Sequence, residues 1–284
     1  MVKSFFDIEE VKGDIEMVNT TIETTTEKEV KLYNELSEKN KYLLEKYGPS
    51  LFNSVWHGTE IRSRAGGMTH NMQKNESEWE IESVDDNTLL KLLELFSVKG
   101  DVVLDPFAGY LNSSRVIYSS GRKLIANDIN SMYIEKSREE YNKYKGLHDY
   151  VIEPMFMIGD AYQTLTSLPT ESVDMILTVL PTRSRESSGG YPANFESLMS
   201  EFHRVLKKDK MVVVILRDEV KGFAGLETFL PTVTTIMRSR FNLQFLNVMV
   251  REDNEGGLGA GSISFQYHKM FFKTHYYIVG GEKS

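Results

Sequence analysis

The chain has 284 residues, of which 40% are hydrophobic, and it contains no cysteine. This length and apolar content suit one α/β domain with an N-terminal extension, and the lack of cysteine excludes disulfides, thiolate metal sites and thiol nucleophiles. The net charge of -8 argues against a uniformly basic surface that coats DNA, although a local basic groove is compatible with it.

Metal and membrane sites are not expected. The six histidines show no pair at zinc-ligand spacing. No apolar run reaches 18 residues, and the first 25 residues lack the apolar core of a signal peptide. We therefore expect a soluble, cytoplasmic protein without a metal ion.

The first part of the chain is polar and helical. Residues 1–26 are predicted to be irregular, and residues 27–47 form a charged helix that ends at Gly48. This helix either packs on the domain by its apolar stripe or binds a partner. Residues 53–80 show no clear period and are predicted to be a loop region. We thus expect a helical and irregular extension over residues 1–80.

The central stretch begins with a helix capped at residues 85–88. A strand follows at residues 101–104, and Asp105-Pro106 ends it because proline lacks an N–H and disfavours helix in the residue before it. Gly109 allows a sharp turn into a helix over residues 113–120. A second strand at residues 123–128 ends in Asp128. An acid at this distance from the first strand suits a ribose diol.

Strands and helices continue to alternate after Asp128. A helix is predicted at residues 131–145, and a strand at 155–158 is followed by Asp160. A further strand starts at Asp174 and ends before Pro181. The remaining elements are helices near residues 195–206 and 226–237 and strands at 211–216, 243–250 and 270–279. This order predicts a three-layer α/β domain over residues 81–284, with a mostly parallel sheet and a terminal antiparallel hairpin.

The residues from Gly100 to Gly109, Gly-Asp-Val-Val-Leu-Asp-Pro-Phe-Ala-Gly, resemble a family motif. The family is the S-adenosylmethionine-dependent DNA methyltransferases that modify the exocyclic amino groups of adenine or cytosine. The resemblance implies a Rossmann-like methyltransferase fold. It also implies that the cofactor S-adenosylmethionine is bound by these residues: Asp105, Pro106, Phe107, Ala108 and Gly109 at the methionine end, Asp128 at the ribose and Asp160 near the adenine.

Two places depart from the family pattern. Leu111 stands where the family has a second glycine close to the cofactor. The catalytic loop of the family, [D/N/S]-P-P-[Y/F/W], corresponds here to Val179, Leu180, Pro181 and Thr182. The family's first residue accepts a hydrogen bond from the target amino group and its aromatic residue stacks on the flipped base. Neither Val179 nor Thr182 has the side chain for these tasks.

Two functions fit these residues. The first is an S-adenosylmethionine-dependent methyltransferase that acts on nucleic acid, DNA more than RNA, with Arg183 and Arg185 as phosphate-binding residues. The second is a catalytically inactive binding or partner subunit for nucleic acid or for an active methyltransferase, in a homo- or hetero-oligomer. A nicotinamide-dependent dehydrogenase is disfavoured because no Gly-x-Gly-x-x-Gly follows the first strand.

Overall fold

The computed structural model describes residues 37–48, 55–59, 84–109, 112–148, 151–181, 195–216, 219–220, 226–227, 229–252 and 275–284. The chain divides into two compact units, residues 1–52 and 53–284. In the first unit, helix α2 (Glu38–Tyr47) begins after Ser37, whose hydroxyl accepts a hydrogen bond from the N–H of Asn40 at 3.2 Å. The helix ends at Gly48, with a φ of 73°, as the sequence predicts. The earlier part of the predicted helix lies outside the described residues.

An eight-stranded sheet forms the centre of the second unit, in the order β1-β9-β10-β6-β5-β2-β3-β4. Five neighbouring strands run parallel: β2 (Val102–Asp105), β3 (Lys123–Asp128), β4 (Met155–Ile158), β5 (Val173–Val179) and β6 (Leu206–Leu216). Strand β10 (His275–Glu282) lies antiparallel between β6 and β9 (Asn242–Glu252), and β1 (Val55–Thr59) pairs parallel with β9. The predicted mostly parallel sheet with a terminal antiparallel hairpin is confirmed.

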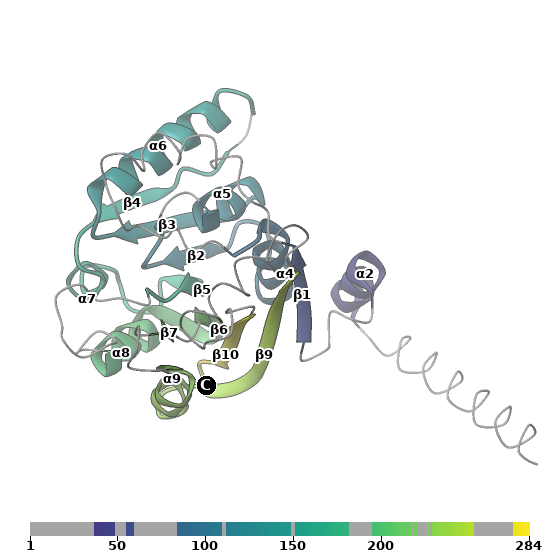
Figure 1. Cartoon of the computed structure of the whole chain (residues 1–284). Helices are drawn as coiled ribbons and strands as arrows, with labels where there is room; N and C mark the ends of the chain where they lie inside the picture. The colour runs from purple at the N-terminus through teal and green to yellow at the C-terminus, as the bar shows by residue number, and fades with distance from the viewer. Residues whose placement is uncertain are drawn as a thin grey trace, which may run out of the picture. The chain divides into compact units, whose positions relative to one another are not determined.

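Helices cover both faces of this sheet (Figure 1). Helices α4 (Asp86–Phe96), α5 (Asn112–Ser119) and α6 (Ser131–Lys145) pack side by side on one face. Helices α7 (Ala161–Leu165), α8 (Phe195–Val205) and α9 (Leu230–Arg238) pack in the same way on the other. The three layers that the alternating elements predict are therefore present.

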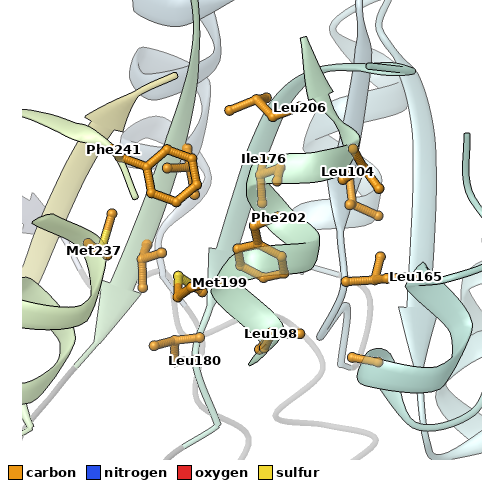
Figure 2. Packing of buried hydrophobic residues seen from close by; sticks show 14 of the residues in the cluster. Leu104, Leu165, Ile176, Leu180, Leu198, Met199, Phe202, Leu206, Met237 and Phe241 are labelled. Atoms are coloured by element: carbon orange, nitrogen blue, oxygen red, sulfur yellow. The ribbon is translucent and has the colours of Figure 1, made fainter. Parts of the chain in front are cut away.

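The largest group of buried apolar side chains lies under α8. The sequence places Phe195, Leu198, Met199 and Phe202 on one stripe of this helix, and all four are buried. Figure 2 shows three of them together with Ile176 of β5 and Leu104 of β2. Apolar side chains from helix and sheet thus exclude water from this face of β2 and β5.

Four elements differ from the sequence-based expectation. Strand β1 lies in the predicted loop region, because pairing with β9, and not an alternating pattern, makes it a strand. Strand β6 begins at residue 206, five residues early, since the backbone of its charged start pairs with Lys283. The predicted helix from residue 226 begins at residue 230, and Leu226–Glu227 is strand β8, which pairs with β7 (Glu219–Val220). Helix α7 is a single short turn without a periodic pattern.

The compact units do not follow the predicted division at residue 80. Residues 55–59 already share the sheet of the second unit, because β1 is hydrogen-bonded to β9. A methyltransferase-like domain that starts at residue 81 stays a prediction. The central sheet also includes β1, which lies before that residue.

The strand order creates a switch point between β2 and β5. From β2 the chain continues to β3 and β4 on one side, and it then crosses to β5 and β6 on the other side of β2. In open α/β sheets, ligands bind outside the carboxyl ends of the strands at such a point. The fold therefore directs attention to the ends of β2 and β5.

Gly280 of β10 allows an aromatic ring to lie against the sheet. A Cβ atom at this position would lie 2.1 Å from Cε1 of Phe245, whose ring stacks on Phe96 of α4 with 5.1 Å between the centroids. We expect Gly280→Ala to lower the free energy of unfolding by about 1–2 kcal/mol, because the ring must leave its stacked position. Urea unfolding of the single variant and of Gly280→Ala with Phe245→Ala tests this: the methyl group should cost less once the ring is gone. Equal costs in both backgrounds would contradict it.

Candidate functional site

Three carboxylates lie at one edge of the sheet. Asp105 is the last residue of β2, Asp128 is the last residue of β3, and Asp160 follows β4 by two residues. The three strands are parallel neighbours, with Asp105 beside Ala126 and Asp128 beside Ile158 in the register. The structure thus brings the three predicted acids to the same carboxyl edge, while their roles in binding stay predictions.

The Asp105 carboxylate is buried, with 1% of its surface exposed. Its Oδ1 accepts hydrogen bonds from the N–H of Phe107 at 3.1 Å and from the hydroxyl of Thr178 at 2.8 Å, and its Oδ2 accepts one from the hydroxyl of Ser113. Burial raises the pKa of Asp105 to about 6, although these three donors lower it, and the charge of Asp128 raises it further. Asp105 therefore organises the loop that follows it and does not present its carboxylate to solvent.

The loop after β2, residues 106–109, folds back onto the end of β3. The N–H of Ala108 donates to the carbonyl of Asn127 at 2.9 Å, and the Asn127 side-chain amide donates to the carbonyl of Pro106 at 3.2 Å. Gly109 has a φ of 51°, in the left-handed region that glycine adopts with little strain. Residues 106–109 thus extend from Asp105 at the end of β2 to Asp128 at the end of β3. We call residues 106–109 the cofactor loop, after the role that the resemblance of the sequence predicts for them.

Asp128 is half-buried and joins the cofactor loop to β3. Its Oδ2 accepts a hydrogen bond from the N–H of Gly109 at 2.8 Å, and its Oδ1 accepts one from the N–H of Asn130 at 2.8 Å. Burial raises the pKa of Asp128 above its ordinary value, and the N–H groups of Asn130 and Gly109 oppose this. A carboxylate has about four acceptor positions, so Asp128 retains capacity for further donors.

Apolar side chains are exposed next to Asp128. Ile129, the following residue, is 72% exposed, and Ile158 at the end of β4 is 50% exposed. Tyr162 of α7 is also exposed. The N–H of Gly159 donates to the carbonyl of Asp128 at 3.0 Å, which brings the ends of β3 and β4 together. The edge therefore combines a carboxylate with an exposed apolar surface.

Asp160 is the N-cap residue of α7. Its Oδ1 accepts hydrogen bonds from the N–H of Tyr162 at 2.9 Å and of Gln163 at 3.4 Å, and so it caps α7. The residue is exposed. Asp160 thus begins the turn beside the apolar surface, and contact between its carboxylate and a ligand stays a prediction.

The predicted acceptor loop is described only at its start. Val179 is half-buried at the end of β5, and Pro181 is exposed. Leu180 is buried, and its N–H donates to the carbonyl of Ile215 at 2.8 Å. Figure 2 shows the Leu180 side chain with those of Leu198 and Met199 in the apolar cluster. Leu180 therefore packs in the core. Four residues that the sequence analysis names lie outside the described ones: Leu111, Thr182, Arg183 and Arg185.

Sequence reasoning missed Thr178 and the side chain of Asn127. Thr178 lies 73 residues from Asp105, and only the pairing of β2 with β5 brings its hydroxyl to the carboxylate. The Asn127 amide donates to the carbonyls of Pro106 and Gly159 and so connects the ends of three strands. A polar residue inside an apolar strand is the signal that would have identified both, because buried polar groups need partners.

Two further observations concern metal ions and membranes. Within the described ranges, no group of three or more His, Asp or Glu side chains has a geometry that would hold a metal ion. The helices in the described part of the chain are all too short or too polar to cross a membrane.

Comparison with known proteins supports the fold. No family model matches the chain. It is 52% identical over 48 residues to the DNA adenine methyltransferase YhdJ of Escherichia coli K12, and this match spans 16% of the chain and 16% of that relative. The structure is similar to that of an S-adenosylmethionine-dependent methyltransferase from Methanosarcina mazei, with a TM-score of 0.51 and 15% identity over 68% of this chain and 96% of that one.

A second solved structure limits what the fold implies. The [4+2]-cyclase SpnF has a TM-score of 0.52 and 12% identity, and the match covers 77% of this chain and 93% of that one. Since its name gives a cyclisation, similarity of fold does not select a reaction. The strand order of the sheet and the match to the Methanosarcina mazei structure show that the second unit of the chain has the Rossmann-like methyltransferase fold.

Proposed function

We propose that the chain binds S-adenosylmethionine at the carboxyl edge of β2, β3 and β4. The observation that carries this proposal is Asp128, a half-buried carboxylate with free acceptor capacity beside exposed apolar side chains. A ribose diol donates two hydrogen bonds to such a carboxylate, and adenine is a flat apolar surface that suits Ile129 and Tyr162. The cofactor loop would hold the methionine end, and Asp160 would lie near the adenine.

The polar groups around the cofactor loop fit a bound group. The Asn127 Oδ1 is buried and has no hydrogen-bond partner among the residues that the structure describes. Native proteins rarely leave such an acceptor unpaired, so a ligand group or a water molecule at this edge would complete it. When bound, S-adenosylmethionine supplies an electrophilic methyl group on a sulfonium. This chain's contribution would be to orient that group with the amides of residues 106–109 and to exclude water by the apolar surface.

We further propose that the chain acts on nucleic acid, with DNA rather than RNA as the target. The short match to a relative named DNA adenine methyltransferase supports this, as does the resemblance of residues 100–109 to the amino-methyltransferase motif. Val179, the backbone of Leu180, Pro181 and Thr182 would line the acceptor side, and Arg183 and Arg185 would bind phosphate groups. On this proposal the carboxyl edge of β2, β3 and β4 would hold the cofactor, which would supply its methyl group to the exocyclic amine of a flipped base held on the acceptor side.

A specific observation favours the alternative, a catalytically inactive binding or partner subunit. The buried Leu180 side chain belongs to the core cluster, and Val179 offers no side-chain acceptor for a target amino group. Loss of a transition-state hydrogen bond typically costs ~10²-fold or more in rate. In this alternative the chain keeps the cofactor edge and positions nucleic acid or an active methyltransferase.

A radiolabelled-methyl assay separates the two functions. The full chain is incubated with methyl-labelled S-adenosylmethionine and mixed DNA or RNA, with and without proteins that co-purify with it. Transfer by the isolated chain that Asp128→Ala lowers when S-adenosylmethionine is below saturation supports the enzyme. Cofactor binding without transfer under all these conditions supports the partner subunit, and the absence of both binding and transfer contradicts both functions.

A further inference from the structure

Strands β2 and β5 are joined by backbone pairing inside the sheet and by a side-chain hydrogen bond at its carboxyl edge. The two strands share register pairs at Val103 with Met175 and at Leu104 with Ile176. Beyond these pairs, the hydroxyl of Thr178 donates to Oδ1 of Asp105 at 2.8 Å. Both side chains are 1% exposed, so water does not compete for this bond. A buried side-chain bond thus joins the two strands where the switch point opens.

The same carboxylate connects three parts of the site. Its Oδ1 also accepts the N–H of Phe107 in the cofactor loop, at 3.1 Å, and its Oδ2 accepts the hydroxyl of Ser113 in α5. Thr178 immediately precedes Val179, where the predicted acceptor loop begins. The bond from Thr178 to Asp105 is therefore a direct link between the acceptor strand and the cofactor loop.

We propose that Thr178 is a positioning residue that fixes the end of β5 to the cofactor loop through Asp105. This inference rests on the proposed binding of S-adenosylmethionine at this edge. Threonine is branched at Cβ and its χ1 is restricted, so the position of the hydroxyl follows the position of the strand. Displacement of the end of β5 would then withdraw one of the three donors that orient the Asp105 carboxylate. Because that carboxylate also accepts the N–H of Phe107, the position of Phe107 would change with it.

The ionisation of Asp105 provides a readout that simple loss of packing would not change. Burial raises the pKa of Asp105 to about 6, the donors Ser113, Thr178 and the Phe107 N–H lower it, and the neighbouring charge of Asp128 raises it. Removal of the Thr178 hydroxyl withdraws a donor from the ionised form. The titration midpoint of Asp105 should then rise, whereas a variant that keeps the hydroxyl should leave it in place.

The test uses the full chain with three substitutions. Thr178→Val has nearly the same shape without the hydroxyl, and Thr178→Ser keeps the hydroxyl. Thr234→Val is the matched control, because among the residues that the structure describes the Thr234 hydroxyl donates within α9, to the carbonyls of Leu230 and Pro231. The midpoint of Asp105 is followed by carbon NMR of its carboxyl group in the unliganded protein. The affinity for S-adenosylhomocysteine is measured by calorimetry at pH 7.

In Thr178→Val, the titration midpoint of Asp105 should rise by roughly one pH unit. The ionised carboxylate loses the stabilisation of one hydrogen bond, which corresponds to about one unit of pKa. The dissociation constant for S-adenosylhomocysteine should increase roughly 2- to 30-fold, the range for residues that couple two sites. Thr178→Ser and Thr234→Val should stay close to the wild-type values in both measurements.

Two results would overturn the inference. An unchanged Asp105 midpoint in Thr178→Val would show that the bond does not act on the carboxylate. A raised midpoint with unchanged affinity would show that the bond exists but does not position the cofactor loop. If the wild-type chain binds no S-adenosylhomocysteine, the proposed function itself fails, and the NMR titration still decides whether Thr178 acts on Asp105.

Discussion

Replacing Asp128 with alanine should weaken the binding of S-adenosylmethionine by about 1.5–3 kcal/mol, which is a roughly 10- to 150-fold increase in the dissociation constant. The carboxylate would lose two charge-assisted hydrogen bonds to the ribose diol. The variant would also lack the hydrogen bonds that the N–H groups of Gly109 and Asn130 donate to Asp128, so the end of the cofactor loop would be held less firmly. Calorimetric titration of the wild type and of Asp128→Ala with S-adenosylhomocysteine measures the effect.

A matched control separates a local effect from a general one. Glu139 of α6 is an exposed carboxylate that accepts a hydrogen bond from Lys136, and Glu139→Ala should bind like the wild type. Thermal unfolding of each variant shows whether the fold is intact. Equal affinity of Asp128→Ala and the wild type would remove Asp128 from the cofactor site.

Replacing Asp105 with asparagine should raise the free energy of unfolding at pH 8, by up to about 3 kcal/mol. The folded-state pKa of about 6 lies above the ordinary value of 3.8 because the carboxylate is buried. The stability that Asp105 contributes is therefore fully present below pH 3.8 and is lost as the pH rises through 6. Asparagine carries no charge at any of these pH values, so the variant avoids the cost of burying an ionised group.

The hydrogen bonds of Asp105 suit this exchange. The asparagine oxygen can accept from Phe107 and Thr178, and its amide can donate to the hydroxyl of Ser113. Urea unfolding at pH 5 and pH 8 should show a larger advantage for the variant at pH 8. Asp209→Asn makes the same exchange at an exposed carboxylate of β6 and is the matched control. A variant that is less stable than the wild type at pH 8 would contradict the burial cost assigned to Asp105.

Strands that end in acids made the centre of the fold predictable. Short apolar runs that stop at Asp105 and Asp128 mark β2 and β3, and the regular spacing of apolar residues from Phe195 to Val205 marks α8. These signals are local, since each depends on residues within one element. The order of such elements was sufficient to predict the layers and the antiparallel hairpin.

Features that depend on distant pairing were not predictable. The sequence of β1, Val-Trp-His-Gly-Thr, shows no alternating pattern, and the strand exists because β9 pairs with it. The burial of Leu180 could not be read from the apolar run that ends in Pro181, because the core position depends on α8. The bond between Thr178 and Asp105 likewise requires two strands 73 residues apart. Sequence reasoning therefore identified the acids at this edge of the sheet and missed the groups that hold them.

We propose above all that S-adenosylmethionine binds at the carboxyl edge of β2, β3 and β4. A crystal structure of the full chain with S-adenosylhomocysteine tests this most directly. We expect both ribose hydroxyls within hydrogen-bond distance of the Asp128 carboxylate, the adenine against Ile129, and the amino-acid end along residues 106–109. A ligand bound elsewhere on the chain, or crystals without ligand after growth at millimolar concentration, would contradict the claim.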